Sequence, residues 1–386
     1  MSLDNSPTPM HFIQEVIPIL NSNGYREVKE TGNWSNIPSK FYVIRDNSNI
    51  VVINKKDLSS GVIVSTHLDS PCLKIKPNSR SCDGHFEQLR VSTYGTGNWY
   101  TWTDRALRVA GRAIYENGEG NIQSGLFFSR DPVAIIPSTT SCFDSKSDSF
   151  NLEERMSPII ALSKLSEECN QLQSEELLNA IGKELNIDKS KILDFEASLV
   201  DANNQKTIGT EKDLIVSSRI SSLLPSITAF NEFIKSGDPG TGLRCFVGFN
   251  NGENGDCLRT GAKSNLLPLV LQSIGCNDYF YENTIVINNL SIPVCLNSKT
   301  KEDKQLLGSG LYYFNEYNEV LSKFTVSLKQ YIQPPKYTKE IVNPLNKYDT
   351  DFITIGIPVL GLNSIRETCN TKDLNELKKF YELLFK

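Results

Sequence analysis

The chain has 386 residues, and 40 Lys and Arg against 45 Asp and Glu give a formal net charge of −5. An acidic balance argues against a general nucleic-acid binder or a binder of anionic membranes, because both need a basic face. With 39% hydrophobic and 22% charged residues, the composition excludes disordered and coiled-coil classes. No apolar run approaches the roughly 18 residues of a membrane span.

Taken in order, the hydrophobic pattern first predicts an amphipathic helix over 8–23, which Gly24 can end. Strands are expected at 50–53 and 62–65. From about 78 to 213 the character changes, with expected strands at 89–91 and 133–136, a Ser-rich turn region at 138–149, and helices at 157–170 and 175–184. Strands of buried type then return at 245–249, 284–287 and 353–355, before a final helix at 372–385.

Strands that alternate with helices predict an α/β fold with a mixed, mostly parallel sheet. In such sheets the functional site lies beyond the carboxyl ends of the strands. Polar clusters follow several of the expected strands, so these clusters are the first places to look for chemistry.

Cysteine and histidine usage narrows that chemistry. The 9 cysteines include no Cys-x-x-Cys pair, which argues against a cysteine-based zinc site and favours a reducing compartment. The amino terminus lacks the basic and apolar regions of a signal peptide, so a cytoplasmic location is expected. Only 3 histidines are present, so mechanisms that need several histidines are disfavoured.

Three segments carry recognisable motifs. Residues 66–71 read Thr-His-Leu-Asp-Ser-Pro, and a His-x-Asp at a strand end suits metal binding, with His67 as ligand and Asp69 orienting it. Taken alone this is a weak signal, because such a pair is more often simply a satisfied polar contact. Residues 94–107 begin with Tyr-Gly and end with Trp-Thr-Asp-Arg-Ala-Leu. Residues 362–367 read Leu-Asn-Ser-Ile-Arg-Glu.

Together, and in this order, the three segments resemble the aspartyl aminopeptidase family of di-zinc exopeptidases, which remove N-terminal acidic residues from peptides. That family reads His-Thr-Asp-Ser-Pro, then Tyr-Gly-Gly with a later Asp-Arg-Asp-Leu, then Met-His-Ser-Ile-Arg-Glu. The resemblance implies an α/β aminopeptidase-like domain split over 1–77 and 214–386. It also implies an inserted, mainly β dimerisation domain over 78–213, and homo-oligomers from dimer to dodecamer.

The resemblance implies seven site positions in this chain. In the family, one zinc takes a His and two Asp, one of them bridging, and the other zinc shares the bridge and adds a Glu and a His. A Glu beside the ligand Glu is the general base. His67 and Glu253 are retained as ligands, and Asp69 is the retained orienting residue.

The remaining positions are replaced. Ser221 stands for the bridging Asp, Gly252 for the base, Asn289 for the second Asp in the loosest part of the alignment, and Asn363 for the last His. A further family His, which reaches a neighbouring subunit, matches Cys142. Ser and Asn are neutral donors that cannot replace carboxylates around Zn²⁺, and glycine cannot accept a proton.

The favoured hypothesis is therefore a catalytically inactive homologue, with zinc binding weak or absent, that is retained for assembly or for binding, with peptides as possible ligands. It could also assemble with an active relative. The alternative is an active zinc aminopeptidase with a relocated or reduced metal site, whose candidate carboxylates are Asp213, Asp256, Asp278 and Glu282. Each of these is more often a solvated surface charge.

Overall fold

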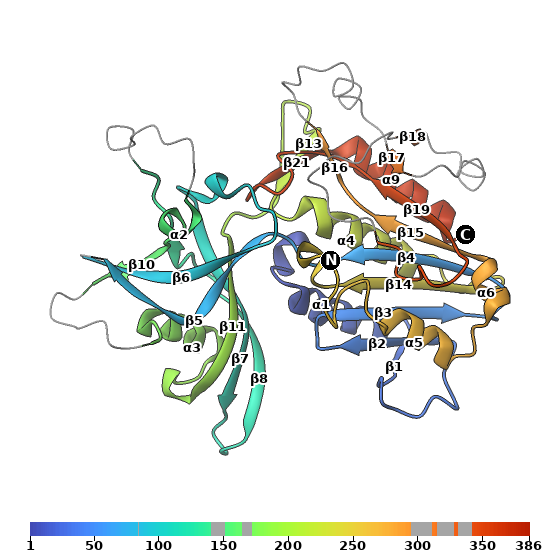
Figure 1. The fold of residues 1–386 in the computed structure, drawn as a ribbon, viewed down its shortest axis with the longest axis horizontal. Helices are drawn as coiled ribbons and strands as arrows, with labels where there is room; N and C mark the ends of the chain where they lie inside the picture. Colours follow the sequence, from blue (N-terminus) through green and yellow to red (C-terminus); the bar gives the residue numbers. More distant parts are fainter. Residues whose placement is uncertain (84, 140–150, 164–171, 295–310, 315–327, 331–341) are drawn as a thin grey trace. The chain divides into compact units, whose positions relative to one another are not determined.

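The fold is given by a computed structural model that describes residues 1–83, 85–139, 151–163, 172–294, 311–314, 328–330 and 342–386 (Figure 1). The described chain forms two compact units. Unit 1 comprises Met1–Ser70, Gln205–Leu362 and Glu367–Lys386, and unit 2 comprises Pro71–Asn204 and Asn363–Arg366. None of the described helices is long and apolar enough to cross a membrane. The expected domain boundaries at 78 and 213 stay a prediction.

Unit 1 is built on a nine-stranded mixed sheet in the order β1-β2-β3-β14-β4-β15-β19-β17-β18. Its strands are β1 (Arg26–Glu27), β2 (Lys40–Arg45), β3 (Asn49–Lys55), β4 (Gly61–His67), β14 (Leu243–Phe249), β15 (Thr284–Asn289), β17 (Leu311–Phe314), β18 (Leu328–Gln330) and β19 (Asp351–Gly356). The four central strands, β14, β4, β15 and β19, are parallel. Their carboxyl ends therefore meet at one edge of the sheet, which is where polar loops can converge.

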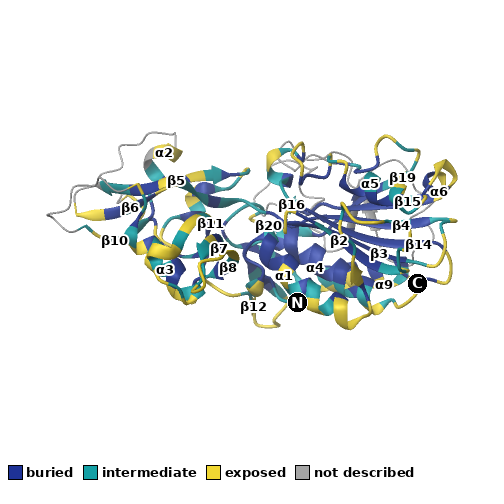
Figure 2. Cartoon of the chain, turned by 90° about the horizontal axis from the view of Figure 1, so that it is seen from below, coloured by how far each residue is buried: buried dark blue, intermediate teal, exposed yellow. Residues whose placement is uncertain are grey.

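Helices cover both faces of this sheet (Figure 2). One face packs against α1 (Pro9–Ser22), α4 (Ile220–Lys235) and α9 (Thr371–Leu384), and the other against α5 (Leu266–Ser273) and α6 (Asp278–Glu282). The first layer has an aromatic centre, where Phe230 of α4 lies 5.4 Å from Phe246 of β14 and 6.3 Å from Phe12 of α1 between ring centroids. Such buried rings contribute large apolar areas to the core.

A smaller five-stranded sheet completes unit 1 in the order β12-β13-β21-β20-β16. Its strands are β12 (Lys206–Ile208), β13 (Leu214–Ser217), β16 (Ile292–Val294), β20 (Pro358–Leu360) and β21 (Glu367–Asn370). Because β13 runs into α4 and β21 runs into α9, this sheet fixes where those two helices begin.

Unit 2 is mainly β. Its seven-stranded sheet has the order β11-β5-β6-β10-β9-β7-β8, and an added β11–β7 pairing links β11 to strands on both of its sides. The strands are β5 (Cys72–Asp83), β6 (Phe86–Tyr94), β7 (Ala106–Glu116), β8 (Ile122–Phe128), β9 (Ala134–Ile135), β10 (Ile159–Leu162) and β11 (Ile192–Asp201), with helices α2 (Leu152–Arg155) and α3 (Glu175–Leu185). All pairings are antiparallel.

The predicted α/β class with a mainly β insert is confirmed. The first helix begins with Pro9, a residue favoured at that position, and Gly24 follows its end at φ +82°. The helix expected over 157–170 is wrong at 159–162, which form β10, since pairing with β6 and β9 outweighs local propensity. Most of the Ser-rich region, Cys142 included, lies outside the described residues.

The reduced state expected for the thiols is wrong at one residue. Cys82 is disulfide-bonded, whereas the described residues Cys245, Cys257, Cys276 and Cys369 are free thiols.

Candidate functional site

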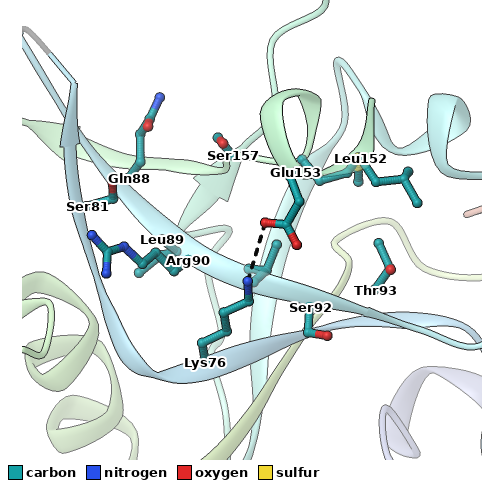
Figure 3. Close-up of a pocket in the computed structure, with 12 residues that line it drawn as sticks. Lys76, Ser81, Gln88, Leu89, Arg90, Ser92, Thr93, Leu152, Glu153 and Ser157 are labelled. Atoms are coloured by element: carbon teal, nitrogen blue, oxygen red, sulfur yellow. Dashed lines mark hydrogen bonds and ion pairs between the residues drawn. The ribbon is translucent and has the colours of Figure 1, made fainter. Parts of the chain in front are cut away.

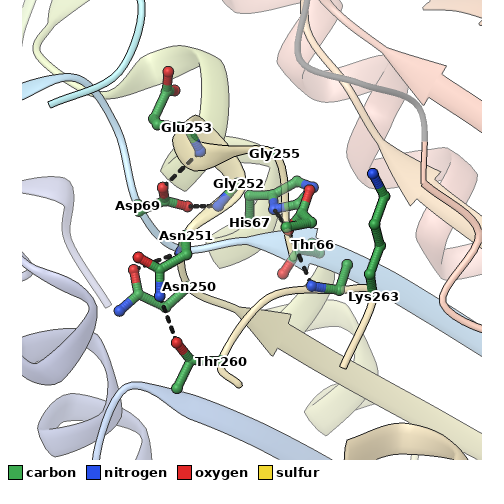
Figure 4. A network of polar contacts seen from close by, with 12 residues as sticks. Thr66, His67, Asp69, Asn250, Asn251, Gly252, Glu253, Gly255, Thr260 and Lys263 are labelled. Atoms are coloured by element: carbon green, nitrogen blue, oxygen red, sulfur yellow. Dashed lines mark hydrogen bonds and ion pairs between the residues drawn. The ribbon is translucent and has the colours of Figure 1, made fainter. Parts of the chain in front are cut away.

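The predicted site forms around His67, the last residue of β4. His67 pairs with Phe249 at the end of β14, so the loop that follows β14 turns directly over it. Asn251 opens this loop in the left-handed region, with φ +64°, and its backbone N–H donates to the Asn250 side chain at 2.7 Å. Figure 4 shows this loop lying beside the His67 ring.

Asp69 binds the backbone of the same loop. Its carboxylate accepts hydrogen bonds from the N–H groups of Gly252 at 3.1 Å and Glu253 at 3.0 Å. Asp69 is 3% exposed, so water screens these charge-assisted hydrogen bonds little, and each contributes strongly to stability. The side chain predicted to orient His67 thus caps the short helical turn Gly252–Asn254.

His67 has a carboxylate neighbour that the motifs did not single out for it. The Nδ1 atom of His67 lies 3.6 Å from Oδ1 of Asp256, and the side chains are 3% and 0% exposed. Oδ1 of Asp256 also accepts the N–H of Ala262 at 3.0 Å. The sequence indicates Asp256 only as one of four candidate carboxylates for a relocated site, each more often a surface charge, and the structure places it buried beside His67.

Gly252 lies directly against the His67 ring. A Cβ atom added at Gly252 would come within 2.5 Å of His67 Nδ1 and 2.9 Å of its Cγ. The carboxylate of the next residue, Glu253, points away from the ring in Figure 4. The position predicted for the general base is therefore next to His67, and the ring occupies the space that a side chain there would need.

Ser221 is the second residue of α4, and its main chain is held from two sides. Its N–H donates to Oε2 of Glu367 at 2.7 Å, and its carbonyl accepts from the Ser291 hydroxyl at 2.7 Å. Glu367 is 2% exposed, and a carboxylate at a helix N-terminus is stabilised by the free N–H groups there. This Glu belongs to the third motif, so the motif contributes a helix cap.

Asn289 points toward α9. Its Oδ1 accepts a hydrogen bond from the Tyr381 hydroxyl, and burial raises the pKa of that phenol, which keeps it a neutral donor. Alternate residues of a strand face opposite sides, and Asn288 is paired in register with Ser65, two residues before His67. Asn288, rather than Asn289, therefore lies on the face that carries His67.

The third motif is divided between the units. Asn363 belongs to unit 2, with φ +64° and a carbonyl that accepts the Asn98 N–H at 2.8 Å. Arg366, also in unit 2, pairs with the buried carboxylate of Asp201 and donates to the carbonyl of Asn203 at 2.9 Å. The structure brings together His67, Asp69, Gly252 and Glu253. It does not place Asn363 relative to these four residues.

Within the described residues, no group of three or more His, Cys, Asp or Glu side chains could hold a metal ion. Of the alternative carboxylates, Asp213, Asp278 and Glu282 are exposed, and Asp256 alone is buried beside His67. His67 and Asp256 are two donors, whereas a catalytic zinc takes about three protein ligands. The donor set found here does not fit a pair of zinc ions.

A separate cavity of about 240 Å³ lies within unit 2, between the β5–β6 pair and α2 (Figure 3). Two of its charged lining residues, Lys76 and Glu153, pair with each other at 3.5 Å. It contains none of the residues predicted for the site.

The comparisons with known proteins agree with the motifs. The Aminopeptidase I zinc metalloprotease (M18) family matches residues 2–296. Aspartyl aminopeptidase 1 of Schizosaccharomyces pombe is 34% identical over 303 residues, covering 70% of this chain and 63% of that protein. The chain spans 62–64% of the length of the curated aspartyl aminopeptidases from S. pombe, Aspergillus oryzae and Caenorhabditis elegans.

Solved structures show the same fold. A chain in the cryo-EM structure of the Ape4 and Nbr1 complex superposes with a TM-score of 0.86 at 25% identity, covering 99% of this chain and 83% of that one. The S. cerevisiae mApe1 dodecamer gives a TM-score of 0.82 at 19% identity, covering 99% of this chain and 94% of that one. From the family match, the motifs and the fold together, the chain belongs to the M18 family of aminopeptidase I zinc metalloproteases.

Proposed function

We propose that this chain is a catalytically inactive M18 homologue whose retained motif residues maintain the fold. The observation that carries the proposal is Gly252, at the position of the general base. A glycine accepts no proton from water, and the His67 ring lies within van der Waals range of where a side chain would begin. Hydrolysis of a peptide bond by a metal-bound water needs both a base and a complete ligand set.

The roles of the retained residues support the proposal. Asp69 caps the Gly252–Asn254 turn, Glu367 caps α4, and Arg366 holds the chain around Asp201. Each of these contacts stabilises the fold without any metal. The replaced positions, among them Ser221 and Asn289, are those whose family role is to bind metal. Selection for stability alone would retain the contacts of Asp69, Glu367 and Arg366. It would allow the metal-binding positions, such as Ser221 and Asn289, to change.

An assay of exopeptidase activity tests this function. We expect no release of N-terminal Asp or Glu from peptides above background, with or without added zinc, and zinc content near zero after dialysis. An aspartyl aminopeptidase from S. pombe, treated identically, serves as the positive control. Release that a chelator abolishes and zinc restores would contradict the proposal.

A second candidate is an active aminopeptidase with a reduced metal site, and the buried His67–Asp256 pair is what favours it. It requires at least one tightly bound zinc per chain in the same dialysed sample. It also requires that His67→Ala remove that zinc. If the chain holds no zinc, this candidate function is excluded, because its mechanism needs the metal.

We further propose that the chain forms homo-oligomers through the inserted domain at 78–213, in a cytoplasmic setting. The solved mApe1 structure with the same fold is a dodecamer, which supports assembly here. Peptide binding and co-assembly with an active relative are compatible with that role. Native mass spectrometry should show a species of two to twelve chains, and a strict monomer over micromolar concentrations would contradict the assembly.

A further inference from the structure

We propose that His67 has become a packing residue whose ring excludes any side chain at position 252, so that position 252 can accept a side chain only when residue 67 changes as well. The proposal deepens the proposed function, because it says why the missing base cannot be regained by one substitution. It concerns how His67 and Gly252 share space, and it does not depend on which ligand the chain binds.

The contact involves the near part of the imidazole ring. Relative to a Cβ atom on Gly252, His67 Nδ1 would lie at 2.5 Å, Cγ at 2.9 Å and Cε1 at 3.0 Å. Carbon atoms pack at about 3.5–4.0 Å, so all three distances are clashes. His67 is only 3% exposed, with Asp256 beside it, so the ring has little free volume into which it can move.

Gly252 differs from neighbouring glycines in what prevents a side chain there. Gly255 needs glycine because its φ is +79°, and Gly261 needs it because an added Cβ would lie 2.1 Å from the Asp256 backbone carbonyl. The backbone of Gly252 is not left-handed, and the three nearest atoms to an added Cβ all belong to the His67 side chain. A shorter side chain at 67 should therefore make a side chain at 252 acceptable.

The consequence for the site is direct. The family's glutamate at 252 and the observed position of the His67 ring cannot coexist. A Gly252→Glu substitution must displace a buried ring from its contact with Asp256, or displace the loop that Asp69 caps. The absence of a side chain at 252 and the present position of the His67 ring therefore depend on each other.

A double-mutant cycle on the full chain tests this, with thermal unfolding as the readout and chelator present throughout. We expect Gly252→Ala to lower Tm by about 2–6 °C, as overpacking does. In the His67→Ala background the same substitution should leave Tm unchanged or raise it by about 1–2 °C, because alanine restricts the unfolded chain.

Two controls separate the clash from general fragility. His67→Asn keeps a heavy atom at the Cγ position, so the penalty of Gly252→Ala should persist in that background. Gly240→Ala, at a glycine with no heavy atom within 4 Å of an added Cβ, should not lower Tm. If His67→Ala does not fold, His67→Gly removes the same ring atoms and leaves no atom at the γ position.

An equal Tm loss for Gly252→Ala in the wild-type and His67→Ala backgrounds would overturn the proposal. So would a wild-type chain that accepts Gly252→Ala without loss. Because the cycle is measured without metal or substrate, its outcome is independent of the peptidase assay. A chain that proves active could still show the coupling, and an inactive chain could lack it.

Discussion

Replacing Asp69 with Asn is expected to lower the free energy of unfolding by about 2–4 kcal/mol. The buried Asp69 carboxylate accepts the N–H groups of both Gly252 and Glu253. The amide of Asn has one acceptor oxygen, so its NH₂ group would face one of these two donors. Urea unfolding of Asp69→Asn against the wild-type chain, monitored by fluorescence or circular dichroism, measures the loss.

The control is Glu282→Gln, which removes an exposed carboxylate of α6 and should change stability by no more than about 0.5 kcal/mol. Running both variants with chelator separates capping from metal chemistry. A residue that only oriented a zinc ligand would show no stability loss once metal is removed. We expect the Asp69→Asn loss to be the same with and without chelator.

The largest effect is expected for Arg366→Met, at about 3–5 kcal/mol. Asp201 is fully buried, and the substitution would leave its charge without the guanidinium partner. The loop carbonyls of Asn203 and Asn204, which accept from the same guanidinium, would also lose their donor. Protease susceptibility near residue 204, together with urea unfolding, should report the change in unit 2.

Two variants test the cause of that loss. Adding Asp201→Asn to Arg366→Met should recover part of the stability, because the buried charge is removed. Lys183→Met breaks an ion pair in the same unit whose side chains are 74% and 73% exposed, and should cost no more than about 1 kcal/mol. Equal losses for Arg366→Met and Lys183→Met would show that Arg366 is only a surface contact.

These two predictions test whether the motif residues are retained for their contribution to stability. If Asp69 and Arg366 each contribute several kcal/mol, their retention follows from stability, because a domain is stable by only about 5–15 kcal/mol in total. Loss of either would then endanger the fold. Gly252, Ser221 and Asn289 carry no such requirement for the family's original residue.

The sequence by itself determined the fold class, the family, and the position of the main secondary structure elements. The reason is local: hydrophobic periodicity reports α1, β4 and α9 directly, and three ordered motifs are too long to match by chance. It also predicted which site positions differ in residue type from the family pattern. This prediction needs no coordinates, because it depends only on which residue occupies each position matched to the family motif.

Only the tertiary structure decided what the surviving residues do. Asp69 binds the backbone of Gly252, which lies 183 residues further along the chain. No motif encodes the packing that decides whether Asp69 faces this backbone or His67. The same holds for Asp256, which the sequence could describe only as one of several acidic residues. Side-chain contacts between distant segments arise from how the parallel strands bring their carboxyl ends together, and this is why the His67–Gly252 contact became visible only in three dimensions.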